Sequence, residues 1–262
     1  MIQVGVAGIG MVAPGIENWA QGRERLLAGD PYDLATPLPK LTGEILPANE
    51  RRRVTTHIKL ALQCAQDAIA GGTLAPTGVA TVFASSGGDL EIVDKIITSL
   101  GQPGKPISPT QFHNSVLNAA AGYWSIATHS HAASTSISAH DASFAAGMLE
   151  AATQVEVEGH PVLLVASDPL SPPALHPSRP LAAPFGVALL LVPGPAKWVV
   201  TIELRKTDAF SEMGIAELER LRGGNPAARS LPLLAQLASG EPGHVSIPYL
   251  SGLGLCLDVA AC

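Results

Sequence analysis

One segment with spacing suited to cofactor chemistry lies near the start of the chain. Residues 8–13 (GIGMVA) follow an apolar stretch and approximate a dinucleotide-binding fingerprint. In that fingerprint a helix begins inside the motif, and the amides at its N-terminus hold the pyrophosphate. Here Pro14-Gly15 follow directly, and no acidic residue ends a second strand about twenty residues further on. We therefore interpret the segment as a strand-to-loop turn and expect no cofactor.

Histidines and cysteines form the other set of potential ligands. His129, His131 and His140 are close in sequence, but they straddle an expected helix end, a strand and a turn. We interpret them as polar loop residues. The three cysteines, which are far apart and show no metal-ligand spacing, are Cys64, Cys256 and Cys262. We expect no metal site, and Cys64 belongs to an apolar helix pattern typical of core.

The spacing of apolar residues along the chain predicts which segments form strands and which form helices, and these elements would position the side chains of a functional site. Strands are expected at about 2–9, 79–84, 132–138, 161–166, 185–192, 198–204 and 253–257. Helices are expected at about 50–70, 89–100, 109–127, 142–157, 215–221 and 231–237. Residues 185–192 and 198–204 are expected to pair as an antiparallel hairpin. The remaining chain, including 19–48, is expected to be irregular.

Composition restricts the class of partner. Of the 262 residues, 47% are hydrophobic and 15% charged, and the formal net charge is −6. Phosphate backbones require clustered Lys and Arg, so nucleic acid is not expected as a partner. The one basic cluster, Arg51-Arg52-Arg53, is interpreted as a solvated helix start, with an anion site or contact with an acidic protein as alternatives. The N-terminus has no signal-peptide pattern and no apolar run reaches membrane-spanning length, so we expect a cytoplasmic protein.

Two segments in the middle of the chain carry the most specific pattern: 108–126 (SPTQFHNSVLNAAAGYWSI) and 136–151 (SISAHDASFAAGMLEA). They resemble the N-terminal half of β-ketoacyl synthases. In that family a helix ending in Ala-Gly leads to a strand, which delivers a cysteine nucleophile to the start of a buried helix. Counting from Ala121-Gly122, or back from Glu150-Ala151, the resemblance places Asp141 at the nucleophile position.

The resemblance extends over about residues 1–200, since 4–15 (VGVAGIGMVAPG) and 161–168 (PVLLVASD) are similar to family strands. It implies a thiolase-like α/β fold, with a mixed, mostly parallel sheet covered by helices. We expect a ketosynthase-like half domain at 1–206, and a C-terminal extension at 207–262 that packs on the same domain.

The departures from the family imply loss of catalysis. The family's cysteine acts as a thiolate, whose pKa is lowered at a helix N-terminus. A carboxylate at Asp141 is a weak nucleophile and is expected to act as a helix N-cap instead. The family's two catalytic histidines belong to its C-terminal half, and the only histidine after residue 206 is His244. We therefore expect no condensation by this chain alone.

Ketosynthase-like chains without the cysteine resemble chain-length factors, and short ones occur in aryl polyene clusters. This implies a heterodimer with a full-length ketosynthase, an acyl chain delivered by acyl carrier protein, and a role in shaping the tunnel during fatty acid-like or polyketide biosynthesis. The helix at 109–127 and the strand at 132–138 are expected at the interface. The candidates to line the tunnel are Phe112, His113 and Val116, followed by Ile92 and Ile96.

Two other hypotheses remain open from the sequence. One is an independent acyl-processing enzyme, such as a decarboxylase or hydrolase, that uses His140 and Asp141. The other is a homodimeric scaffold protein with no role in a tunnel.

Overall fold

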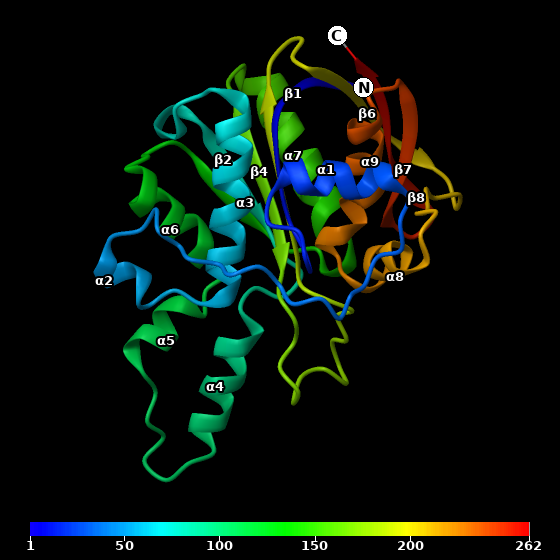
Figure 1. Cartoon of the computed structure of the whole chain (residues 1–262). Coiled ribbons are helices and arrows are strands. Elements are labelled where there is room, and N and C mark those ends of the chain that lie inside the picture. The colour runs from blue at the N-terminus through cyan, green and yellow to red at the C-terminus, as the bar shows by residue number, and fades with distance from the viewer. Residues whose placement is uncertain (262) are drawn as a thin grey trace.

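One eight-stranded sheet runs through the protein, whose computed structural model describes residues 1–261 (Figure 1). The strand order is β3-β2-β4-β5-β1-β6-β8-β7. The strands are β1 (Ile2–Val12), β2 (Ala80–Ala84), β3 (Ser134–Ile137), β4 (Val162–Asp168), β5 (Phe185–Val192), β6 (Trp198–Lys206), β7 (Gly243–Leu250) and β8 (Leu253–Ala261).

Helices cover both faces of this sheet. The α-helices are α1 (Trp19–Ala28), α2 (Ala48–Arg51), α3 (Thr56–Gly72), α4 (Leu90–Leu100), α5 (Pro109–Asn114), α6 (Ala119–Thr128), α7 (Ser143–Glu158), α8 (Ala216–Gly224) and α9 (Leu231–Ser239). Short 3-10 turns lie at η1 (Pro76–Gly78), η2 (His140–Ala142) and η3 (Ala227–Ser230).

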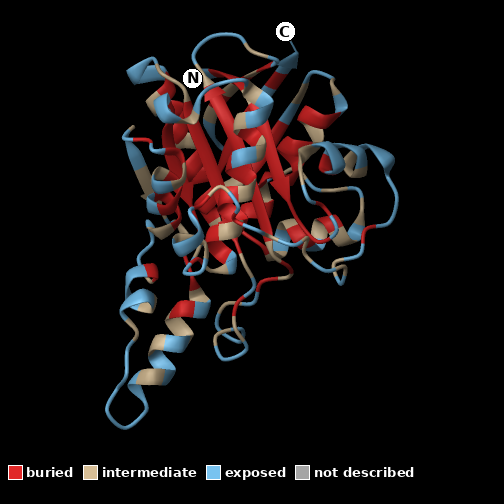
Figure 2. Cartoon of the chain, turned by 60° about the vertical axis from the view of Figure 1, so that its left-hand side comes forward, coloured by how far each residue is buried: buried red, intermediate tan, exposed pale blue. Residues whose placement is uncertain are grey.

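Alternate residues of the central strands face two separate hydrophobic cores. In β4, Leu163 and Val165 pack with α3 and α6, while Leu164 and Ala166 pack with α7 on the opposite face. A strand that is buried on both faces is apolar throughout, which explains the continuous run at 162–166. Figure 2 shows this buried centre, with exposed residues at the surface and on the projecting helices.

The expectation of a mostly parallel sheet is wrong. In the part of the chain that the structure describes, parallel pairing is confined to β2 with β3 and β2 with β4, and the other five strand pairings are antiparallel. The parallel strands are joined by helical crossovers, which parallel pairing requires. From β4 onward the connection to β5, residues 169–184, contains bends and turns but no helix. This connection reverses the direction of the chain, so that β5 pairs antiparallel with β4.

Strand β1 lies between β5 and β6, so these two strands do not form the expected hairpin. The turn expected at 8–13 is also wrong, because β1 continues to Val12. Its glycines serve close packing instead. A Cβ added at Gly10 would lie 2.0 Å from the carbonyl oxygen of Cys64 on α3, and one at Gly8 would lie 2.0 Å from that of Ala68.

Other boundaries differ from the sequence pattern. The helix expected at 109–127 is divided into α5 and α6, and the one expected at 50–70 into α2 and α3. Helix α1 lies in the stretch expected to be irregular. Strand β7 was not expected either. It forms the sheet edge beside β8, which pairs with β6.

Substitution of Gly10 by Ala tests the close approach of α3 to β1. The new methyl group would meet backbone rather than a mobile side chain, so we expect a loss of about 2 kcal/mol in the free energy of unfolding. Gly223→Ala is the matched control, since no atom lies within 4 Å of its added Cβ. Equal urea midpoints for the two variants would contradict this account of the packing.

Candidate functional site

The connection between β3 and α7 is a tight elbow. It passes through η2, where His140 has a positive φ of 51°, a conformation that costs an L-residue roughly 1–2 kcal/mol. The hydroxyl of Ser143 accepts a hydrogen bond from the amide of Ala139 at 3.0 Å and donates one to the carbonyl of His140 at 2.7 Å. The elbow thereby fixes Asp141 at the entrance to the buried helix.

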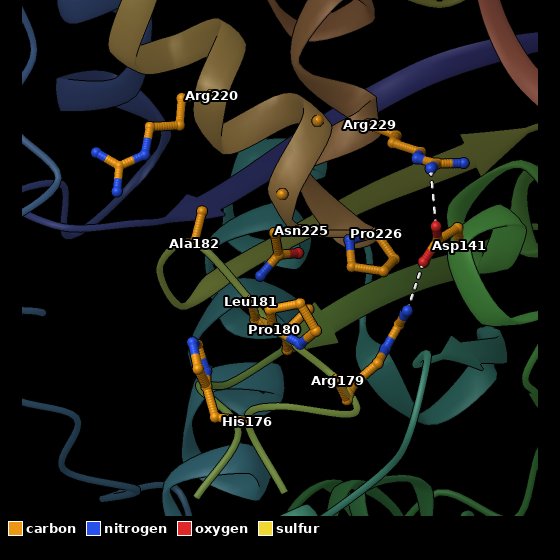
Figure 3. A pocket seen from close by; sticks show the side chains of 12 residues that line it. Asp141, His176, Arg179, Pro180, Leu181, Ala182, Arg220, Asn225, Pro226 and Arg229 are labelled. Atoms are coloured by element: carbon orange, nitrogen blue, oxygen red, sulfur yellow. Dashed lines mark hydrogen bonds and ion pairs between the residues drawn. The ribbon is translucent and has the colours of Figure 1, made fainter. Parts of the chain in front are cut away.

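Asp141 is held by two arginines rather than by the helix backbone (Figure 3). Its Oδ1 accepts a hydrogen bond from Arg179 Nη1 at 2.6 Å, and its Oδ2 accepts one from Arg229 Nη2 at 3.2 Å. Neither η2 nor α7 has a side-chain cap hydrogen bond at its N-terminus. The expectation that Asp141 acts as a helix N-cap is therefore wrong, since its carboxylate is directed at the guanidinium groups.

These contacts control the charge of Asp141. Partial burial acts to raise the pKa of its carboxyl group, but the hydrogen bond from Arg179 and the charges of Arg229 and Arg179 outweigh it. The net effect is a pKa lowered from the usual value of 3.8. Asp141 is thus a stably ionised carboxylate, with low basicity and low nucleophilicity.

His140 lies beside Asp141, with 74% of its side chain exposed. Its Nδ1 is 3.3 Å from Asp141 Oδ1, and its Nε2 is 3.0 Å from Arg179 Nη1. A guanidinium group can only donate hydrogen bonds, so the Arg179 contact is a hydrogen bond only in the tautomer of His140 whose Nε2 is unprotonated. In that tautomer, the nitrogen that would accept a proton in general-base catalysis is already engaged.

A pocket of about 570 Å³ opens beside Asp141. We call it the arginine pocket, after three of its lining residues, Arg179, Arg220 and Arg229. Its walls are the loop 176–182 and the end of α8 with residues 223–226. His176 also lines it, and among the lining residues, all in the described part of the chain, Asp141 is the only acid.

A buried network behind the pocket positions η3 and hence Arg229. Asp168, at the end of β4, accepts hydrogen bonds from the Ser85 hydroxyl at 2.9 Å and the Ala227 amide at 3.2 Å. Asn225 Nδ2 donates to the carbonyls of Asp168 at 3.0 Å and Ala183 at 2.8 Å. The sequence alone did not identify Asp168 or Asn225 as members of a network. The position of Asp168, an acidic residue at the end of an apolar strand, is a sequence feature that could have indicated a buried polar network.

Three of the five tunnel candidates line a second hollow. Phe112, His113 and Val116 lie on a groove of about 560 Å³ formed by α5 and α6. The His113 ring meets the Tyr123 ring edge to face, with centroids 6.3 Å apart. Ile92 is buried on α4 and Ile96 is half-buried, and neither lines the groove. The structure thus brings together the first three candidates and not the other two.

Exposed apolar side chains are concentrated in the segment that includes this groove, from the end of α4 to α6. Helices α4 and α5 and the loop between them project from the body of the protein (Figure 1). Half of the large apolar residues that are exposed in residues 1–261 lie between positions 97 and 126. They are Ile97, Leu100, Ile107, Phe112, Val116, Leu117 and Ile126. We call this the α4–α6 surface. Strand β3 ends the sheet nearby and, among residues 1–261, pairs only with β2.

The described residues that could bind a metal ion or supply a thiol are dispersed or buried. Residues 1–261 contain no group of three His, Cys, Asp or Glu side chains that could hold a metal ion. Cys64 and Cys256 are free and buried, and burial strongly raises the pKa of the Cys64 thiol. Cys262 lies outside the described residues. No helix within the described part of the chain is long and apolar enough to cross a membrane.

The effect of Asp141→Asn on stability should depend on pH. Because the folded state lowers the pKa of Asp141, the charged carboxylate stabilises the fold above about pH 4 and loses this effect as the pH falls through the folded-state pKa. With 45% of the side chain exposed, we expect a loss of about 1 kcal/mol near pH 7. Urea unfolding at several pH values measures it. Asp208→Asn is the control, because Asp208 is exposed and forms no ion pair within residues 1–261. A loss of stability in Asp141→Asn that does not depend on pH would contradict the conclusion that the folded state lowers the pKa of Asp141.

Comparisons with known proteins show similarity to chains of ketosynthase complexes. A chain of the complex of the ketosynthase ApeO with its chain length factor ApeC, from Xenorhabdus doucetiae, is 25% identical with a TM-score of 0.77, and the match covers 98% of this chain and 100% of that one. A chain of the ishigamide ketosynthase/chain length factor is 17% identical with a TM-score of 0.73, covering 100% and 99%. The comparison with curated proteins gave no match.

A further similar structure is the complex of a type II PKS acyl-carrier protein with its ketosynthase bound to the hexaketide (AntDE:AntF). One chain of that complex is 16% identical with a TM-score of 0.76, and the match covers 100% of this chain and 99% of that one. Likenesses at this level of identity show the fold. The sequence itself matches the family described as β-ketoacyl synthase, N-terminal domain, over residues 18–243. That match spans most of the 262 residues, and the chain belongs to the β-ketoacyl synthase N-terminal domain family.

Proposed function

We propose that this chain is a non-catalytic, chain-length-factor-like subunit that pairs with an active, full-length β-ketoacyl-ACP synthase. The observation that carries the proposal is the state of Asp141. At the position where the family resemblance places the nucleophile, the side chain is a carboxylate fixed between Arg179 and Arg229.

The chemistry around Asp141 supports a silent site. Condensation by the family mechanism requires a thiolate that carries the acyl chain as a thioester. The ionised carboxylate of Asp141 is a poor replacement, and the Nε2 lone pair of His140 is engaged by Arg179. The same contacts weigh against an independent enzyme built on His140 and Asp141.

The α4–α6 surface supports the choice of partner. An exposed apolar patch of this kind marks a protein interface, and the open edge of β3 adds unpaired backbone groups to the same region. Two of the similar complexes contain a ketosynthase with a chain length factor, and a chain of each resembles this one over nearly its full length. We infer that a ketosynthase covers the α4–α6 surface.

The groove on α5 and α6 is the part of this surface suited to an acyl chain. Its lining includes Phe112, Val116 and Ile126, which offer apolar contact, whereas His113 and Asn118 are polar. We propose that the partner closes this groove and that its depth limits the length of the acyl chain delivered by acyl carrier protein. The third similar complex holds such a carrier with its ketosynthase.

Co-expression with a full-length ketosynthase from the same gene neighbourhood tests the pairing. We expect a one-to-one complex in affinity purification and sizing, and we expect Phe112→Glu to reduce its recovery at least tenfold, because a charge would be buried at the interface. The matched control is Leu250→Glu, an exposed apolar residue on β7 at the opposite edge of the sheet. A chain that purifies only with itself contradicts the proposal and favours a homodimeric scaffold.

Product length in the purified complex tests the groove. Phe112→Ala and His113→Ala each enlarge the hollow, so we expect the distribution of acyl or polyene products to shift toward longer chains. Ile97→Ala, on α4 outside the groove, removes similar apolar area and serves as the control. Mass spectrometry of the released products measures the shift, and an unchanged distribution in both groove variants rules out the role in chain length.

A further inference from the structure

The arginine pocket carries more positive charge than its own acid neutralises. Arg179 and Arg229 share the single carboxylate of Asp141. Arg220, on the opposite wall, lies 3.3 Å from Glu217 and is 66% exposed. The interior of the pocket is therefore left with one guanidinium charge in excess.

This excess lies where water screens it poorly. The Arg179 and Arg229 side chains are only 17% and 19% exposed. Within residues 1–261, Arg179 Nε and Nη2 are buried without a hydrogen-bond partner. Burial lowers the pKa of Arg229, and the nearby charges of Arg222 and Arg179 add to the effect. Buried charges and donors of this kind are costly unless an anion accompanies them.

The geometry also shows what kind of anion fits. Arg179 comes from the loop after β4 and Arg229 from η3, and each donates one hydrogen bond to a different oxygen of the same carboxylate. Guanidinium groups favour the oxygens of carboxylates and phosphates as acceptors, and a second nitrogen of each group can add a further hydrogen bond. The pocket of about 570 Å³ beside them has room for a second oxyanion.

We propose that the arginine pocket is a binding site for a small oxyanion, a phosphate or carboxylate group, that Arg229 and Arg179 hold. Asp141 acts as an internal competitor, because it occupies the same donors when the ligand is absent. The site goes beyond pairing with a ketosynthase and does not depend on it, since every contact comes from this chain.

Isothermal titration calorimetry at constant ionic strength tests the site, with inorganic phosphate and succinate as separate probes. We expect one saturable site for at least one probe, and the probe that binds identifies phosphate or carboxylate as the preferred group. Asp141→Asn removes the competing charge, so it should tighten binding about tenfold.

Arg229→Lys keeps the charge but loses the planar fork, and we expect it to weaken binding about tenfold. Arg205→Lys is the matched control, because Arg205 is also ion-paired, 2.7 Å from Glu203 on β6, but lies outside the pocket. No saturable heat with either probe overturns the proposal. So does equal affinity in the native protein and Asp141→Asn, a comparison that remains valid if Arg229→Lys fails to fold.

Discussion

Two mostly buried arginines bind the half-exposed carboxylate of Asp141, and the surrounding elements are arranged around this ionic interaction. Arg179 and Arg229 provide the opposite charges, and each depends on a different loop. The loop that carries Arg179 joins β4 to β5, and η3 carries Arg229. Asp168 and Asn225 bind η3 to the end of β4 through hydrogen bonds. The elbow, the sheet end and η3 are thereby one connected unit.

The same interaction bears on the proposal of a silent site. A nucleophilic cysteine would need a free path to an acyl thioester, whereas two arginines converge on Asp141, the residue at the position to which the family resemblance assigns the nucleophile. The apolar α4–α6 surface is a different region, formed by the projecting helices α4 and α5 together with α6. One part of the chain is thus suited to charge recognition and another to contact with a protein, and the two can be tested independently.

Most central elements were predictable, because their signals are local. The sequence shows β2, β4 and β5 as short apolar runs and α7 as a helical pattern of apolar residues. Helix α1 has little apolar periodicity, although Asn18 and the left-handed Gly29 mark its ends. Strand β7 contains Pro248, which argues against a strand except at a sheet edge. The insertion of β1 between β5 and β6 is a long-range event that no local pattern reports.

The candidate site also contains features that local sequence patterns predict and features that depend on long-range contacts. The family resemblance singled out Asp141 by counting from nearby segments, and it gave Phe112, His113 and Val116 as tunnel candidates on the helix expected at 109–127. The partners of Asp141 are 38 and 88 residues away in sequence, so only the fold reveals that they converge. This is also why Asp141 was expected to cap a helix, the interaction that a local reading favours for an acid at that position.

Hydrogen–deuterium exchange of this chain, alone and bound to a full-length ketosynthase, tests the central claim most directly. The account predicts that amides in α4, α5, α6 and β3 become protected in the complex, while those of β7 at the opposite sheet edge exchange at unchanged rates. Protection confined to β7 and β8, or no change within residues 90–137, would contradict it.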